Sequence, residues 1–236
     1  MYLNREECEN MKIKQHIKKV VFESQFLYHI AKQIQSLLCK RGTVLIENHG
    51  LARLHKDVIG ANNIVRIGKE STLYDTKILI HGNNNKIEFG ENVFVGPDCS
   101  FWIEGNNCEI YIGNKTSFTM GVHFCVQEDG MSIKTGGDCM FSNSIIVRKS
   151  DSHPIYNDLK QRINNAKRVM IGNHVWIAPN SKVMKGVTIG DDAIIGSDTI
   201  VTKDVPAASC AVGHPARVVK SNIEWTREHF SCLLST

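Results

Sequence analysis

An aliphatic residue returns at every sixth position across the C-terminal half of this chain. These positions are Ile171, Ile177, Val183, Ile189, Ile195 and Val201. A small or β-branched residue lies four places after each of them, at Val175, Ser181, Val187, Ala193, Thr199 and Val205. An α-helix repeats every ~3.6 residues and a half-buried strand every second residue, so neither explains this spacing. A fixed short period instead predicts stacked coils, each of which buries an apolar edge against its neighbour.

The repeat also carries a glycine or an alanine directly after four of the aliphatic residues, at Gly172, Ala178, Gly190 and Gly196. This pattern resembles the hexapeptide motif of the left-handed parallel β-helix acyltransferases. The resemblance implies an all-β fold in which three hexads form one triangular coil, so that residues three hexads apart stack. The left-handed winding follows from the resemblance alone, because parallel crossovers are otherwise right-handed.

Less regular hexads precede this region, at Ile67-Gly68, Phe89-Gly90 and Val95-Gly96. Asparagine-rich segments at 83–85 and 106–107 interrupt them. Asparagine tolerates positive φ and therefore suits the corners of a coil. We predict that residues 43–220 form one β-helix domain that is irregular at its N-terminal end.

We predict that residues 1–42 form a helical cap over the first coil. Apolar residues recur there at helical spacing, including Ile13, Ile17, Val20, Val21, Leu27, Ile30 and Ile34. Solenoids need caps because a bare terminal coil would expose its apolar edge. The alternative is a basic amphipathic helix in peripheral contact with a membrane surface. Four glutamates in the segment favour the cap: Glu6, Glu7, Glu9 and Glu23.

A short helix is predicted at the C-terminal end, over residues 221–236. Ser221 is a suitable N-cap residue, and Glu224 occupies the capping-box position three residues later.

One long insertion breaks the repeat, over residues 148–170. It is polar, has no hexad register, and the repeat resumes in phase after it. A long loop in an otherwise regular solenoid is more often functional than not. We therefore predict a protruding loop that carries part of a functional site.

The insertion contains His153, in the sequence Ser-Asp-Ser-His-Pro-Ile-Tyr. The His-Pro-Ile tripeptide, followed by Ile-Gly-Asn-His-Val-Trp-Ile, resembles the active-site region of maltose and galactoside O-acetyltransferases. The segment is also similar to capsule and polysialic acid O-acetyltransferases of the same fold. The resemblance extends from Asp151 to about Trp225 and implies that His153 is the catalytic base.

Acetyl transfer from a thioester to a hydroxyl group needs such a base, because a protonated alcohol is a poor nucleophile. Neutral imidazole suits this task near physiological pH. Asp151, or alternatively a backbone carbonyl, is a candidate to orient the ring of His153 by accepting its other N–H. The insertion contains no cysteine, which favours direct attack by the acceptor over a covalent acyl-enzyme.

The resemblance also implies a set of residues that bind acetyl-CoA. Trp176 matches a position close to both the acceptor and the thioester, so it belongs to the catalytic and the cosubstrate sets. Positions along the pantetheine arm are matched by Ala178, Pro179 and Ser197, and positions near the adenine and phosphate end by Thr202, Lys203, Arg217 and Lys220. Cations at the last positions suit a ligand rich in phosphate.

Composition adds limits to this interpretation. The 236 residues suffice for one elongated domain with a cap, and the net charge of +4 does not indicate a nucleic-acid partner. The first 30 residues lack the apolar core of a signal peptide, and no transmembrane segment is expected, so a cytoplasmic location is the default. Eight cysteines without C-x-x-C pairing predict reduced thiols and no metal site.

The leading functional hypothesis is an acetyl-CoA-dependent O-acetyltransferase acting on a saccharide, such as a capsule polysaccharide or another surface glycan. The resemblance further implies a homotrimer with active sites between neighbouring subunits. Three alternatives remain at this stage: an N-acetyltransferase of an amino sugar nucleotide, a zinc-dependent carbonic-anhydrase-like β-helix, and a non-catalytic scaffold. The zinc alternative would need His123, His153 and His174 to converge.

Overall fold

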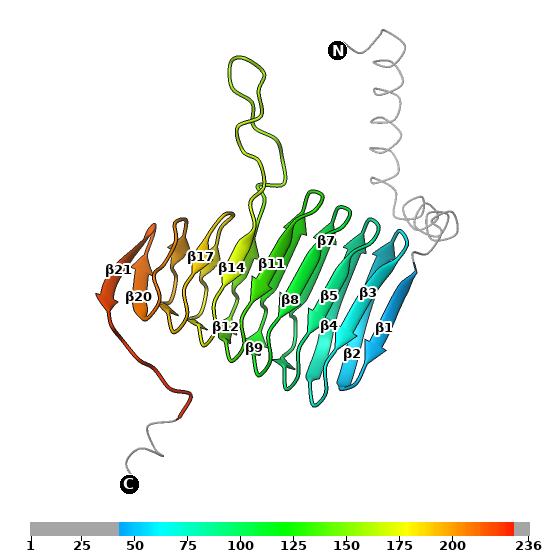
Figure 1. Cartoon of the computed structure of the whole chain (residues 1–236), viewed down its shortest axis with the longest axis horizontal. Helices are drawn as coiled ribbons and strands as arrows, with labels where there is room; N and C mark the ends of the chain where they lie inside the picture. The colour runs from blue at the N-terminus through cyan, green and yellow to red at the C-terminus, as the bar shows by residue number, and fades with distance from the viewer. Residues whose placement is uncertain (1–42, 229–236) are drawn as a thin grey trace, which may run out of the picture. The chain divides into compact units, whose positions relative to one another are not determined.

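The structure is a computed structural model that describes residues 43–228. Within this range the chain forms 21 strands and no helix. The strands wind into a stack of coils, and nearly every strand pairs in parallel with its counterpart in the next coil (Figure 1). The all-β solenoid expected from the hexad repeat is thereby confirmed.

Successive strands fall into three rows, which we call faces I, II and III. Face I is the seven-stranded sheet of β1 (Val44–Asn48), β3 (Asn63–Ile67), β5 (Lys86–Phe89), β8 (Glu109–Ile112), β11 (Ser132–Thr135), β14 (Val169–Ile171) and β17 (Thr188–Ile189). Face II contains β6 (Phe94–Val95), β9 (Ser117–Met120), β12 (Met140–Asn143), β15 (Trp176–Ile177), β18 (Ile194–Ile195) and β20 (Ser209–Gly213). Face III contains β7 (Ser100–Glu104), β10 (His123–Gln127), β13 (Ile146–Arg148), β16 (Lys182–Val183) and β19 (Ile200–Val201).

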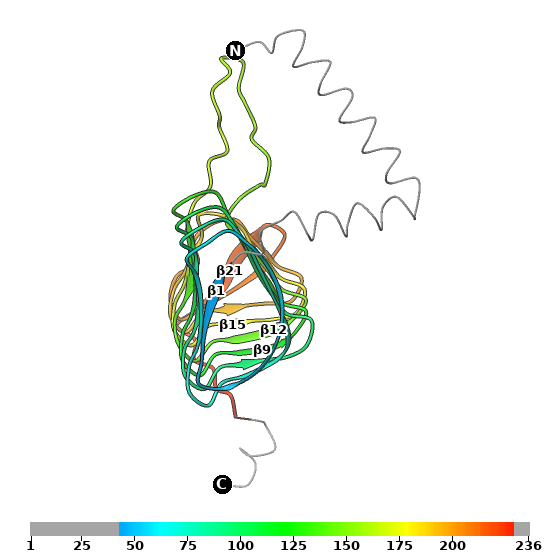
Figure 2. The same cartoon turned by 90° about the vertical axis from the view of Figure 1, so that its right-hand side faces the viewer.

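Two long strands, β2 (Leu51–Ile59) and β4 (Thr72–His81), join faces II and III into one fourteen-stranded sheet. The final strand, β21 (Ala216–Ser221), folds back antiparallel on β20. The coils superpose when viewed along the stack (Figure 2).

The coils differ in length. In the C-terminal part residues 18 apart pair, as Met170 does with Thr188 and Trp176 with Ile194, which confirms the stacking expected of three hexads. In the N-terminal part the paired residues are 19 to 23 apart, as Val44 and Asn63 are in the first coil and Lys86 and Glu109 further along. The extra residues lie in the asparagine-rich turns, where side chains pair with backbone of the adjacent coil. Asn106 Oδ1, for example, accepts a hydrogen bond from the Asn83 N–H at 2.9 Å.

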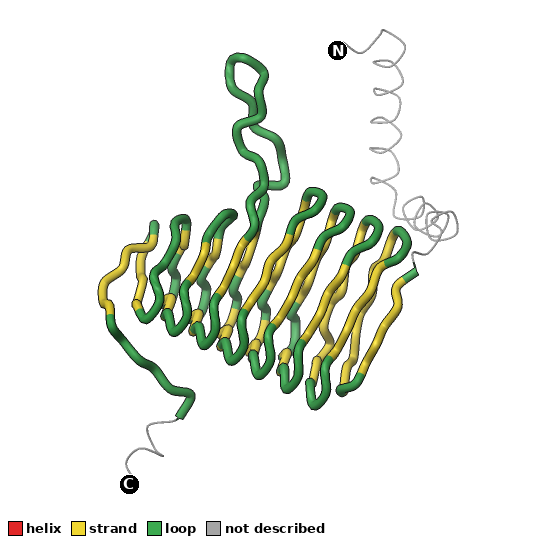
Figure 3. The backbone as a smooth tube through the Cα atoms, in the orientation of Figure 1, coloured by secondary structure: helices red, strands yellow, loops and turns green. Residues whose placement is uncertain are grey.

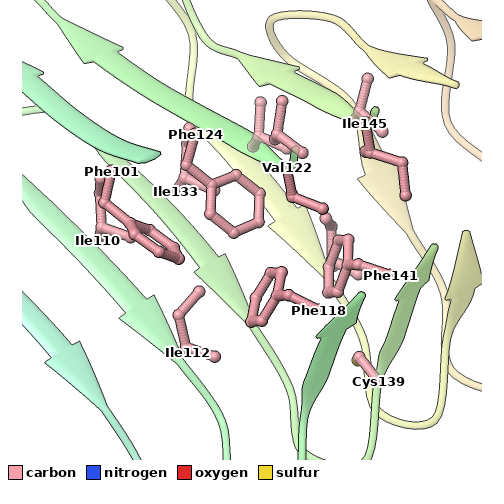
Figure 4. Close-up of a cluster of buried hydrophobic side chains, with 14 of the residues drawn as sticks. Phe101, Ile110, Ile112, Phe118, Val122, Phe124, Ile133, Cys139, Phe141 and Ile145 are labelled. Atoms are coloured by element: carbon pink, nitrogen blue, oxygen red, sulfur yellow. The ribbon is translucent and has the colours of Figure 1, made fainter. Parts of the chain in front are cut away.

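The inward side chains fill the stack with aliphatic and phenylalanine residues. Phe118 and Phe141 stack with their ring centroids 4.7 Å apart, and Phe124 meets Phe141 edge-on at 5.6 Å (Figure 4). The predicted hexad residues Ile177, Val183 and Ile195 are fully buried. Burial at about 25 cal/mol per Å² of apolar surface makes this continuous core the main source of stability.

The hexapeptide glycines are explained by close approach of the next coil. A Cβ atom at Gly172 would lie 2.2 Å from Asp191 Oδ1, and one at Gly190 would lie 2.4 Å from the Ala207 nitrogen. The corner between faces I and II instead uses residues with positive φ. We call this the corner row: Lys115, Asp138, His174, Asp192 and Ala208.

The predicted insertion is a loop in the structure. It covers residues 149–168, between β13 and β14, and projects beyond the coils (Figures 1 and 3).

The predicted C-terminal helix is wrong where it can be compared. Strand β21 continues to Ser221, and residues 222–228 contain no helix. The Ile223 N–H donates to the Ala208 carbonyl at 3.0 Å, and Trp225 and Arg227 also bond to the coils. These tertiary contacts hold the segment extended and override the local capping signal. The helical cap predicted for 1–42 and the end of the chain beyond 228 lie outside the described residues.

Residues 43–228 contain no helix, and therefore no helix that is long and apolar enough to cross a membrane.

Candidate active site

The loop that carries His153 is fastened to the coil before it by a carboxylate clamp. Glu128 follows β10, and its carboxylate accepts hydrogen bonds from Arg162 at 2.6 and 2.9 Å. The Ser150 hydroxyl donates to the same group at 3.0 Å. The hydrogen bonds from Arg162 lower the pKa of Glu128 below its ordinary value. Both ends of the loop are therefore tied to one corner of the solenoid.

A second clamp fastens the loop to the coil after it. The ammonium group of Lys185, which follows β16, donates to the Asp151 carboxylate and to the Asn164 carbonyl oxygen. Asn164 Nδ2 donates to the same carboxylate at 2.9 Å. The hydrogen bond from Lys185 is the main reason that the pKa of Asp151 lies below its ordinary value.

Asn164 also holds the backbone at and directly after the predicted catalytic residue. Its Nδ2 donates to the His153 carbonyl oxygen at 2.8 Å, and its Oδ1 accepts from the Ile155 N–H at 2.7 Å. Asn164 is buried, whereas the ring of His153 is exposed and forms no hydrogen bond within residues 43–228. The Asp151 carboxylate is bound to Lys185 and Asn164, so in this structure it does not meet the imidazole.

Lys149 is an unexpected member of this region. Its side chain is fully buried at the first position of the loop, and its ammonium group donates to the Glu128 carbonyl oxygen at 3.3 Å. Burial lowers its pKa to about 8. No sequence signal separates it from the exposed lysines of the same insertion.

Trp176 opens β15 on face II and is half-buried. It is covered by the C-terminal segment: its ring centroid lies 5.9 Å from that of Trp225. Trp225 in turn stacks on His174 at 3.9 Å, with the two rings nearly parallel, and donates from Nε1 to the His174 carbonyl at 2.9 Å. The sequence motifs point to Trp176 but not to Trp225, whose only signal is an aromatic residue in a polar tail.

One chain does not bring His153 and Trp176 together. The loop with His153 leaves the solenoid at the corner between faces III and I, after β13 (Figure 2). Trp176 lies beyond the next corner, at the start of face II. Within one chain these two predicted catalytic residues therefore belong to different edges of the solenoid.

The residues predicted to bind the pantetheine arm lie in successive coils at the corner between faces II and III. Ala178 is buried, and its N–H donates to the Ile195 carbonyl at 2.8 Å. The Pro179 carbonyl accepts from the Asp198 N–H at 2.9 Å, which places exposed Ser197 beside Pro179.

The residues predicted for the phosphate end lie around β19 and β21. Lys203 and Arg217 line one open cavity of about 270 Å³, together with Asp204 and Val218. Thr202 is exposed beside Lys203, and Lys220 is exposed on β21, opposite Cys210. The structure thus gathers two of the predicted cations at one cavity.

The three histidines that a zinc site would need lie apart. His123 lies on β10, where its Nδ1 is 2.6 Å from the Ser100 hydroxyl, and burial lowers its pKa. His153 lies on the loop and His174 on the corner row. Across residues 43–228 no three histidine, cysteine or acidic side chains are arranged to hold a metal ion.

Comparison with known proteins agrees with this architecture. The family Bacterial transferase hexapeptide (six repeats) matches residues 168–203. A polysialic acid O-acetyltransferase of Neisseria meningitidis is 36% identical over 73% of this chain and 80% of the relative. A polysialic acid O-acetyltransferase of Escherichia coli O1:K1 is 39% identical over 54% of this chain. That match spans only 41% of the E. coli relative's length.

A crystal structure of a polysialic acid O-acetyltransferase superposes with a TM-score of 0.69. It is 30% identical to this chain, and the match covers 80% of this chain and 90% of that one. The fold, the hexads and the extent of these matches show that the chain belongs to the hexapeptide-repeat acetyltransferase family. The family resemblance inferred from the sequence is confirmed.

Proposed function

We propose that this protein transfers an acetyl group from acetyl-CoA to a hydroxyl group of a capsule-type polysaccharide, with polysialic acid as the first acceptor to test. The observation that carries the proposal is the match to the N. meningitidis polysialic acid O-acetyltransferase, which extends over 80% of that relative. The match therefore extends well beyond the hexapeptide repeats at 168–203.

His153 is the general base in this proposal. Its Nε2 or Nδ1 accepts the proton of the acceptor hydroxyl as the oxygen attacks the thioester carbonyl. The tetrahedral intermediate then collapses, the carbon–sulfur bond breaks, and the imidazolium returns the proton to the departing thiolate. The hydrogen bonds from Asn164 keep the backbone of His153 in place during this step. Asp151 acts through Lys185 and Asn164, by holding the loop.

Acetyl-CoA supplies the activated acetyl group and lies along the corner that holds Ala178, Pro179 and Ser197. Its phosphates bind at the cavity lined by Lys203 and Arg217, with Thr202 and Lys220 beside it. Charge-assisted hydrogen bonds to phosphate are strong enough to make these cations the main anchors of the nucleotide end.

The complete site forms between two subunits of a homotrimer. A second copy is needed because His153 and Trp176 lie on different edges of one chain. The loop also carries an apolar tip that a neighbour would cover: Ile155, Tyr156, Leu159 and Ile163 are 52, 57, 76 and 62% exposed. Left-handed winding of the coils, as in the hexapeptide family, belongs to the same proposal.

The proposal is tested by incubating the purified protein with acetyl-CoA and polysialic acid. We expect free thiol to appear together with an acetyl mass increment on the polymer. His153→Ala should lower kcat by about 10²–10⁴-fold while leaving coenzyme A binding intact, as expected for loss of a general base. No acetylation of polysialic acid or of other capsule polysaccharides would overturn the proposal, and a His153→Ala variant with near-normal kcat would overturn the assignment of the base.

A further inference from the structure

Residues 222–228 form an ordered segment that crosses the coils, and we call it the strap. After β21 the strap meets the corner row first at Ala208, through the Ile223 N–H. It meets His174 next, through Trp225. Arg227 then reaches the coils of β12 and β9. The strap thus runs across several coils at the edge where face II begins (Figures 1 and 3).

Arg227 fastens the far part of the strap. Its Nε pairs with the Asp138 carboxylate at 2.7 Å, and its Nη2 donates to the Cys139 carbonyl at 2.6 Å. Its Nη1 donates to the Ser117 hydroxyl at 3.0 Å. Hydrogen bonds from a guanidinium group to several acceptors are directional, so they fix the path of the strap as well as its end.

Trp225 fastens the middle of the strap to a rigid partner. His174, on which it stacks, is itself held by the Asp192 carboxylate at 2.9 Å from Nδ1. A parallel stack at 3.9 Å together with the Nε1 hydrogen bond leaves the Trp225 indole one orientation. The imidazole of His174 therefore serves as a platform for Trp225.

The strap lies directly against Trp176. The two indoles are 5.9 Å apart and inclined by 45°. Trp176 Nε1 is buried and has no hydrogen-bond partner among the described residues. A buried donor without a partner is unfavourable, so this hydrogen-bonding group does not hold the Trp176 ring, and the contact with Trp225 is what limits its orientation.

We propose that Trp225 is a positioning residue for acetyl-CoA, an inference that rests on the proposed function above. Trp225 is held by its stack on His174 and by the contacts of Arg227. It limits the Trp176 indole to the orientation in which this indole contacts the thioester end of acetyl-CoA. The part of the Trp176 indole that remains exposed then packs against the thioester end of acetyl-CoA. Trp225 acts through Trp176 and takes no part in proton transfer.

Three variants test this role: Trp225→Ala, Trp225→Phe, and Glu224→Ala as a control on an exposed neighbour in the strap. Coenzyme A affinity is measured by calorimetry and acetyl transfer by steady-state kinetics. We expect Trp225→Ala to raise the Kd for coenzyme A and the KM for acetyl-CoA about 3- to 10-fold, which corresponds to the free energy of one aromatic contact. The change in kcat should be smaller. Trp225→Phe keeps an aromatic ring on His174 and should recover most of the affinity, and Glu224→Ala should match the wild type.

Unchanged affinity and KM in Trp225→Ala, in an active wild-type background, would overturn this inference and leave the proposed function standing. Equal losses in Trp225→Phe, Trp225→Ala and Glu224→Ala would also overturn it, because they would indicate a merely structural strap. A wild-type protein that neither binds coenzyme A nor transfers acetyl groups would overturn the proposed function and, with it, this inference. Thermal melting of each variant identifies losses that come from unfolding.

Discussion

At the scale of single residues, the largest departure from ordinary behaviour is at Lys149. Lysine is almost never fully buried unless it is paired, yet this ammonium group meets the carbonyl oxygen of Glu128 inside the solenoid. Desolvation lowers its pKa to about 8. The thiols of Cys108 and Cys125 lie close enough to influence it, and burial raises their own pKa values.

Replacing Lys149 by Met should raise the free energy of unfolding at neutral pH and change its pH dependence. The unfolded chain keeps the Lys149 proton up to the ordinary pKa of 10.5, whereas the folded chain releases it near pH 8. Between these values the folded state binds fewer protons, so the destabilising contribution of Lys149 fades as pH rises. The stability advantage of Lys149→Met should therefore shrink from about pH 8 to about pH 10.5.

Urea unfolding at several pH values measures this difference. The matched control is Lys167→Met, an exposed lysine of the same loop. Lys149 lowers the pKa values of the Cys108 and Cys125 thiols, so the comparison is made in a background in which both cysteines are replaced by alanine. Parallel pH profiles for the wild type and Lys149→Met would contradict the prediction.

At the scale of elements, the loop of residues 149–168 differs from a free insertion because it is tied to both neighbouring coils. Glu128 holds it from one side and Lys185 from the other. Asn164 links the second clamp to the backbone of His153. The base of the loop is thus rigid, while its apolar tip is exposed.

Asn164→Ala should lower kcat by about 10- to 100-fold, because small displacements of a catalytic group have effects of that size. It should also reduce the free energy of unfolding by about 1–3 kcal/mol through the buried groups left unpaired. Kinetics and thermal melting measure the two effects separately. Asn165→Ala, an exposed neighbour, is the control, and wild-type kcat in Asn164→Ala would show that the clamp does not position His153.

At the scale of the whole molecule, the separation of His153 from Trp176 within one chain is the feature on which the proposed shared site rests. A corner row and a complete strand, β14, lie between the loop and Trp176. In the homotrimer that we propose, cyclic association would bring the two residues together, because each copy would present its loop to the next copy's face II.

We expect light scattering to find a trimer and mixed variants to regain activity. His153→Ala and Trp176→Ala subunits should each be impaired alone. After mixing and reassembly at equal amounts, about one quarter of the interfaces should join an intact His153 to an intact Trp176. An active monomer, or no recovery after verified subunit exchange, would refute a site shared between subunits.

The β-solenoid, the position of the loop and the stacking of three hexads were predictable from the sequence. Their cause is local and periodic: a hexad places Ile177 or Val183 inward wherever it occurs, and glycines such as Gly172 are required by the adjacent coil. The candidate residues His153 and Trp176 came instead from the resemblance of their motifs to those of the acetyltransferase family.

The contacts between side chains far apart in the sequence became known only from the tertiary structure. The Glu128–Arg162 clamp joins residues 34 apart, and Arg227 meets Ser117 across 110 residues. Long-range contacts also hold residues 222–228 extended where a helix was predicted. Another such contact pairs Asp151 with Lys185 and not with His153. Short-range patterns determine how each coil forms, whereas side chains that meet across coils depend on the packing of the whole stack, and only the folded chain brings them into contact.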